Sequence, residues 1–186
     1  MFSYTINNPN NFEIKTDNYY TIPFGYRCTS ALACRYANIR KMSLPFDWTI
    51  PLTPNKIRKV LENNFEDFIP DVENGIFCNK YDIGLAHFNP DINTGIEEYK
   101  RRIDRFNTII NEKNKKFYFI FINYDYLNNI NFRDDTYNDN IFNGMLDLEY
   151  FLKEKYNNID YNILYFNFKH HNISENSNII NIIFYF

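Results

Sequence analysis

A cysteine in the first quarter of this 186-residue chain stands where a nucleophile is expected. Cys28 lies in the segment GYRCTSAL, between a strand-like run that ends in Gly25 and a helix-like run rich in Ala and Leu. Backbone N–H groups and the dipole at a helix N-terminus stabilise a thiolate, which is the reactive form of cysteine. The segment therefore predicts Cys28 as a nucleophile. The alternative is a buried, inert thiol, the usual state of a free cysteine.

A histidine is the ordinary activator of such a thiol, because a neighbouring imidazole accepts its proton. The chain has three histidines, and we expect His87, in the segment GLAHFNPD, to be the base. A histidine at the end of a strand can instead be a hydrogen-bonded structural residue. The tandem pair His170 and His171 follows a later strand-like run and is the alternative base, although we expect such a pair to be exposed.

An aspartate lies within the apolar segment SLPFDWTIP, residues 43–51, with no obvious basic partner nearby. Asp47 could be a turn residue, a helix cap, or a site residue that orients His87. Capping is the least attractive interpretation, because Thr53 and Pro54 already mark the start of the next helix.

Further residues complete the candidate site. Backbone N–H groups near Cys28 are expected to stabilise an oxyanion. The pocket and oxyanion candidates are Thr29, Trp48 and Asn123. The sequence has no zinc-binding spacing and no glycine-rich phosphate loop, so we expect neither a metal nor a cofactor.

Strand-like and helix-like runs alternate along the whole chain. The strand-like runs are residues 18–25, 81–88, 115–123, 160–168 and 178–186, and the helix-like runs are residues 28–40, 53–68, 93–114 and 140–158. Such alternation is typical of a mainly parallel sheet flanked by helices. We therefore predict one three-layer α/β domain over residues 1–186, with residues 1–17 as an irregular N-terminal extension.

The candidate residues follow the predicted strands or extended segments. In open α/β sheets, ligands bind outside the carboxyl ends of the strands. We therefore expect one edge of the sheet to gather Cys28, Asp47, His87, Asn123, Asp125, His170 and His171.

Composition restricts the partners. With 20 basic and 23 acidic side chains, the net charge is −3, which disfavours nucleic acid. The longest uncharged apolar run, residues 178–186, is far shorter than the roughly 20 residues that span a bilayer.

No signal peptide is evident, and three cysteines without a Cys-x-x-Cys pair favour a reducing compartment. We expect a soluble cytoplasmic protein. The bias toward Asn, Ile, Lys, Tyr and Phe suggests an AT-rich genome, such as that of a virus, in which case the cytoplasm is the host's.

Several segments together resemble a family of papain-like cysteine peptidases, known as a domain of unknown function in bacteria, plants and large DNA viruses. The similar segments are IPFGYRCTSALACRYANIRKMSLPFDWTI, VLENNFEDFI, IGLAHFN and EYKRRIDRFNTII, within residues 18–123. That family typically has a Ser-Leu-Gly-x-x-Cys segment, a Pro-Phe-Asp-Trp block, a histidine after a strand and an arginine-rich helix. The resemblance implies Cys28 as nucleophile, His87 as base, and Asp47 as a residue that orients the imidazole or shapes the pocket. This chain departs from the pattern in having Pro-Phe-Gly before the cysteine, and in Asn123 where a basic residue is expected.

The sequence thus predicts a thiol-dependent hydrolase or acyl transferase that acts on a protein or peptide substrate. Peptide, isopeptide and ester bonds all remain open as targets, and the oligomeric state is not indicated. The alternatives are a non-catalytic α/β protein-binding module and an SGNH-like esterase or metal-assisted hydrolase that uses Asp47 and His87.

Overall fold

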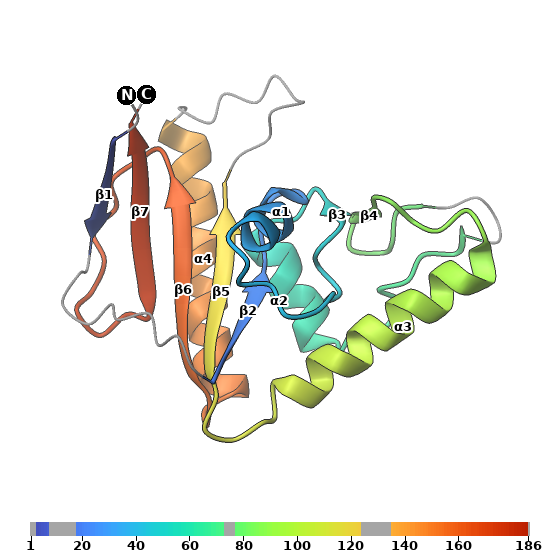
Figure 1. Ribbon diagram of the computed structural model, residues 1–186. Coiled ribbons are helices and arrows are strands. Elements are labelled where there is room, and N and C mark those ends of the chain that lie inside the picture. The colour runs from blue at the N-terminus through green and yellow to red at the C-terminus, as the bar shows by residue number, and fades with distance from the viewer. Residues whose placement is uncertain (1–2, 8–17, 73–76, 124–134, 186) are drawn as a thin grey trace.

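The computed structural model describes residues 3–7, 18–72, 77–123 and 135–185 (Figure 1). Its centre is a five-stranded sheet in the order β1-β7-β6-β5-β2. The strands are β1 (Ser3–Asn7), β2 (Tyr19–Pro23), β5 (Lys116–Ile122), β6 (Asp160–Asn167) and β7 (Ile179–Tyr185). The helices are α1 (Thr29–Tyr36), α2 (Pro54–Glu62), α3 (Ile92–Ile109) and α4 (Asp135–Lys155). A separate antiparallel pair consists of β3 (Thr49–Ile50) and β4 (Gly84–Leu85).

The predicted parallel sheet is confirmed. β2 pairs with β5, β5 with β6 and β6 with β7, all in parallel. β1 pairs with β7 in antiparallel register, from Ser3 opposite Tyr185 to Asn7 opposite Asn181. The expectation of an irregular segment over residues 1–17 is therefore wrong for residues 3–7. Five residues are too short for periodicity to identify a strand, and this one depends on a partner at the far end of the chain.

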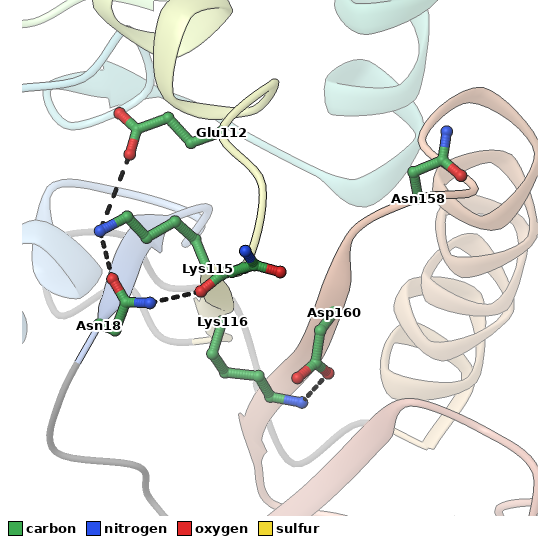
Figure 2. A pocket seen from close by; sticks show the side chains of 7 residues that line it. Asn18, Glu112, Lys115, Lys116, Asn158 and Asp160 are labelled. Atoms are coloured by element: carbon green, nitrogen blue, oxygen red, sulfur yellow. Dashed lines mark hydrogen bonds and ion pairs between the residues drawn. The ribbon is translucent and has the colours of Figure 1, made fainter.

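The amino ends of β2, β5 and β6 border a pocket of about 410 Å³ at the edge opposite Cys28 (Figure 2). Its two lysines are engaged by neighbouring side chains. Lys115 contacts Asn18 and lies 3.9 Å from Glu112, while Lys116 pairs with Asp160. None of the predicted site residues lines this pocket.

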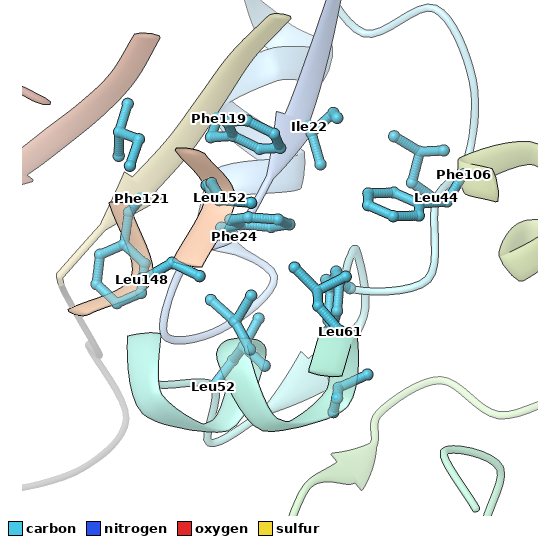
Figure 3. Packing of buried hydrophobic residues seen from close by; sticks show 14 of the residues in the cluster. Ile22, Phe24, Leu44, Leu52, Leu61, Phe106, Phe119, Phe121, Leu148 and Leu152 are labelled. Atoms are coloured by element: carbon cyan, nitrogen blue, oxygen red, sulfur yellow. The ribbon is translucent and has the colours of Figure 1, made fainter. Parts of the chain in front are cut away.

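Apolar side chains cover both faces of the sheet, as the continuous apolar run of β5 predicts. Phe117, Phe119 and Phe121 of β5 belong to the larger cluster, which includes side chains of α2, α3 and α4. Figure 3 shows part of this packing, with Phe24 and Phe119 near Leu148 and Leu152 of α4. Tyr118 and Ile120 of β5 face the other way and pack with Cys34 of α1. The predicted three layers are thus present.

The segment between β2 and β5 lies beside edge strand β2 (Figure 1). It contains α1, the β3–β4 pair, α2 and α3, together with Cys28, Asp47 and His87. The prediction that residues 81–88 form a strand of the main sheet is wrong, because only β4 is extended and it pairs with β3. The buried Asn79 side chain accepts hydrogen bonds from Tyr81 N and Ile83 N, so local turn bonds replace those of a strand.

The described helices include none that is both long and apolar enough to cross a membrane. The two longest, α3 and α4, have 18 and 21 residues. Both carry charged side chains, including Arg102 on α3 and Lys153 on α4. Their buried residues face the sheet or its neighbours, as expected of amphipathic helices.

A buried carboxylate on α4 connects this helix to the segment before β7. Glu149 Oε2 accepts a hydrogen bond from Ser177 Oγ at 2.9 Å, and Oε1 accepts one from Asn178 N at 2.5 Å. Because Glu149→Ala leaves two partly buried donors without their acceptor, it should lower the free energy of unfolding by about 1–2 kcal/mol in urea denaturation. Glu154→Ala, at an exposed position of the same helix, should stay within about 0.5 kcal/mol of the unmodified chain. Equal losses in the two variants would contradict this role.

Candidate active site

Cys28 occupies the N-cap position of α1, just beyond the carboxyl end of β2. Its backbone is helical, with φ −55° and ψ −8°, and its carbonyl accepts a hydrogen bond from Leu32 N at 2.9 Å. The half-buried thiol makes no capping bond, and the next residue, Thr29, has a buried hydroxyl with no hydrogen-bond partner among the described residues. The Cys28 sulfur is therefore not held by the helix that it begins.

Close packing against β5 fixes the turn before Cys28. A Cβ atom at Gly25 would lie 1.8 Å from Ser30 Oγ, so no larger residue fits there. Ser30 Oγ in turn accepts a hydrogen bond from Ile122 N at 3.1 Å, which joins the first turn of α1 to the end of β5. Sequence reasoning did not identify Ser30, since nothing in the local pattern shows that it contacts a strand far along the chain.

Asp47 is fully buried and paired with an arginine. Its Oδ2 atom accepts hydrogen bonds from Arg40 Nε at 3.1 Å, from Arg40 Nη2, and from Leu44 N at 3.0 Å. The expectation that no nearby basic residue pairs with Asp47 is therefore wrong, because the chain folds back between residues 40 and 47. Burial raises the pKa of the Asp47 carboxyl, and the Arg40 guanidinium opposes that rise.

The other side of Asp47 contains polar atoms that the sequence did not indicate. Asp47 Oδ1, Tyr99 OH and Arg102 Nη1 are buried and have no hydrogen-bond partner among the described residues. The Arg102 guanidinium lies 4.6 Å from the centre of the Tyr99 ring. Burial raises the pKa of Tyr99 to about 12, and the Asp47 charge adds to this effect. Arg102, in the arginine-rich run of α3, is thus largely buried, and its charge acts on Asp47.

His87 is exposed and follows β4 by two residues. Its φ of 57° places it in the left-handed region, which is uncommon for a residue other than glycine. Its ring meets the Trp48 ring edge-on, with 5.5 Å between the centroids and 80° between the planes. Because β4 belongs to the small sheet, the expectation that His87 follows a strand of the main sheet is wrong.

The segment between β2 and β5 contributes all three main candidates from three different loops. They are Cys28, Asp47 and His87, and they are not joined to one another. Within the described ranges, no hydrogen bond links any two of them. His87 has the Trp48 ring as its neighbour, whereas Asp47 has Arg40. Catalytic hydrogen bonds are often long in a protein without substrate and form only in the complex.

Asn123 follows β5 and lies at the carboxyl edge of the sheet, as predicted. It is fully buried, and its Nδ2 group donates to Asn138 Oδ1 at 3.1 Å. Its Oδ1 atom accepts from Tyr137 OH at 3.0 Å. The amide therefore connects β5 to α4 and is already engaged. Asp125 lies outside the described residues.

The tandem histidines have different environments. His170 is exposed, as expected. His171 is buried, which is contrary to expectation, because its ring stacks on Phe142 of α4 with centroids 4.0 Å apart. His171 Nδ1 also lies 3.9 Å from Asp139 Oδ1. His171 is thus packed into the interface between α4 and the sheet.

The other two cysteines differ sharply in exposure. Cys34 is buried against the sheet, and this burial, together with the Asp47 charge, raises its pKa to about 11. Cys78 is exposed. At pH 8 only about one Cys34 side chain in a thousand is a thiolate, so Cys34 should react far more slowly with a disulfide reagent than Cys78. Mass mapping of the labelled sites tests this order, which equal labelling of the two in the folded protein would contradict.

The raised pKa also gives the pH dependence of stability. Above about pH 9 the unfolded chain loses the Cys34 proton while the folded chain keeps it, so the contribution of Cys34 to stability should fall as the pH rises to about 11. Cys34→Ala should flatten that part of the curve of unfolding free energy against pH.

Among the described residues, no group of three or more His, Cys, Asp or Glu side chains could hold a metal ion. Comparisons with protein-family models, with curated proteins and with solved structures found no match. The functional interpretation therefore rests on the site itself and on the motifs described above.

Proposed function

We propose that this chain is a thiol-dependent hydrolase or acyl transferase in which Cys28 is the nucleophile and His87 the base. The observation that supports this best is the position of Cys28. It combines a partly accessible thiol, a helix N-terminus and the carboxyl end of a parallel strand. These conditions favour a reactive thiolate and leave backbone N–H groups free to bind an anion.

In the proposed reaction, His87 accepts the Cys28 proton and the thiolate attacks a substrate carbonyl carbon. Backbone N–H groups at the start of α1 stabilise the oxyanion of the tetrahedral intermediate. The intermediate collapses to a thioester on Cys28, and the leaving amine or alcohol takes the proton from His87. Water, or an acceptor amine, then attacks the thioester and gives its proton to His87 before the thiol is regenerated.

The remaining candidates take supporting roles in this proposal. Asp47 holds Arg40 and the Pro-Phe-Asp-Trp block in place instead of contacting the imidazole. Asn123 connects β5 to α4, and the Thr29 hydroxyl belongs to the residue that follows Cys28. The motifs that resemble the papain-like family favour a protein or peptide substrate, and the unpaired cysteines favour a cytoplasmic setting.

A chloroacetamide probe tests the nucleophile. At neutral pH, Cys28 should be alkylated at least about tenfold faster than the exposed Cys78, because in the proposal Cys28 lies at a helix N-terminus and has a base that takes its proton. His87→Gln should bring the rate at Cys28 down toward that of Cys78, whereas His170→Gln, at another exposed histidine, should not. The proposal fails if Cys28 in the folded protein is alkylated no faster than Cys78.

A non-catalytic binding module is the second candidate, and one observation favours it. The His87 ring contacts Trp48, and no described hydrogen bond joins it to Cys28. Tryptophan is also enriched at protein interfaces, because its ring is largely apolar and its N–H group is polar. Slow alkylation of Cys28, unaffected by His87→Gln, would favour this function over catalysis.

A further inference from the structure

The only tryptophan of the chain contacts both a cation and the proposed base. Arg40 Cζ is 5.7 Å from the centre of the Trp48 ring. The His87 ring meets the same indole edge-on, with 5.5 Å between the centroids. We call these three side chains, Arg40, Trp48 and His87, the Trp48 cluster.

The Arg40 side of this cluster is rigid. The guanidinium donates to Asp47 Oδ2 through two nitrogens and to Ser43 Oγ at 2.9 Å. The Arg40 side chain is only 15% exposed, and that of Asp47 is fully buried. Two hydrogen bonds to one buried oxygen and a third to Ser43 fix both the position and the plane of the guanidinium. The ring of Trp48 thus has an immobile neighbour.

The His87 side depends on Trp48 for its contacts. The backbone is held nearby, since Leu85 pairs with Thr49 and Phe88 stacks on Tyr99 at 5.9 Å. The exposed His87 ring itself has Trp48 as its one ring contact, and no hydrogen bond or ion pair with any described residue. The indole is therefore the surface that sets where the imidazole lies.

We infer that Arg40 is a positioning residue for His87 and acts through Trp48. This inference rests on the proposed function, in which His87 is the base. Arg40 holds the indole, and the indole limits the orientations of the imidazole from which it reaches a substrate-bound Cys28. The same arrangement places a permanent cation next to the ring that His87 contacts.

Other charged groups on the packed segments have partners of their own. Asp47 pairs with Arg40, and Glu98 with Arg102 at 3.5 Å. Asp91 accepts a hydrogen bond from Thr94 N at the start of α3. Arg40 is thus the charged residue of these segments that lies over the Trp48 ring.

Tryptophan fluorescence reports this contact directly, because an imidazole that touches an indole quenches its emission. At a fixed neutral pH, His87→Gln should raise the emission of Trp48, and His170→Gln should leave it unchanged. Unchanged Trp48 emission in a folded His87→Gln variant would overturn the inference at its first link.

The positioning role of Arg40 is tested by replacing Arg40 and Asp47 together. The double variant Arg40→Met/Asp47→Asn avoids leaving a buried charge alone. In this background, the rise in Trp48 emission caused by His87→Gln should be about half as large. The rate of Cys28 alkylation at neutral pH should also fall severalfold. Lys41→Met is the matched control. It removes a cation from the adjacent position, where Lys41 lies over Tyr19 instead of Trp48, and should change neither readout.

Arg40→Lys is the decisive variant if the double variant does not fold. A lysine keeps the charge but cannot hold two hydrogen bonds to Asp47 in the same plane, so a smaller rise in Trp48 emission on His87→Gln is again expected. An unchanged rise in emission and an unchanged alkylation rate in a folded Arg40 variant would overturn the inference. Slow alkylation of Cys28 in the unmodified chain, with the fluorescence results as expected, would instead overturn only the proposed function.

Discussion

Asp47→Ala should lower the free energy of unfolding by about 3–5 kcal/mol, which is the usual effect of breaking a buried ion pair. The carboxylate is fully buried, and its loss leaves the largely buried Arg40 guanidinium without its anion. The Leu44 N–H group loses its acceptor in the same step. Urea denaturation of the folded protein measures the change.

An ion pair with an exposed carboxylate, also in the segment between β2 and β5, is the matched control. Asp82 pairs with Lys56 at 2.8 Å, but its side chain is 84% exposed. Asp82→Ala should therefore lower the free energy of unfolding far less than Asp47→Ala does. Arg40→Met/Asp47→Asn should recover part of the loss seen in Asp47→Ala, because no buried charge remains alone. Equal losses of unfolding free energy in the Asp47 and Asp82 variants would show that the Arg40–Asp47 pair does not stabilise the segment between β2 and β5.

Gly25→Ala should both destabilise the protein and reduce the reactivity of Cys28. The added Cβ would lie 1.8 Å from Ser30 Oγ and 2.8 Å from Ser30 Cβ, and a change of the serine rotamer relieves only the first contact. The first turn of α1 must therefore shift away from β5, at a cost of about 2–3 kcal/mol. Because Cys28 precedes this turn, its alkylation should slow toward the rate of Cys78.

Two variants separate this steric effect from a general effect of adding a methyl group. At Gly144 on α4 the nearest atom to an added Cβ is Asn55 Nδ2 at 3.2 Å, on a side chain at an exposed position. Gly144→Ala should therefore be close to neutral, since alanine also favours the helix. Gly25→Ala/Ser30→Gly removes both clashing atoms and should restore part of the stability and reactivity. Unchanged stability and unchanged alkylation in Gly25→Ala would rule out this turn as the element that positions Cys28.

Local patterns were sufficient to predict most of the fold. The apolar run of β5 predicted a strand buried on both faces, and residues 117–121 are indeed buried. Thr53 and Pro54 predicted the start of α2, where Thr53 Oγ1 accepts a hydrogen bond from Lys56 N at 3.4 Å. Such signals are reliable because side-chain periodicity and helix capping depend on residues a few positions apart.

The errors of sequence reasoning occurred where a distant or irregular contact decides the structure. β1 is a strand only because β7 offers an edge at the other end of the chain. The segment around Asn79 becomes a turn because one buried amide bonds to two backbone N–H groups. Neither effect appears as a period in the sequence.

The sequence by itself determined the α/β layers and the placement of Cys28 between a strand and a helix. Only the tertiary structure decided the partners of the other two candidates, because Asp47 pairs with Arg40 across an irregular bend and His87 meets Trp48 across two loops. Hydrophobic periodicity is a local property and selects elements, whereas ion pairs and ring contacts depend on how those elements pack. This is why the candidate nucleophile was evident from the residues alone, while the contact between Arg40 and the tryptophan was not.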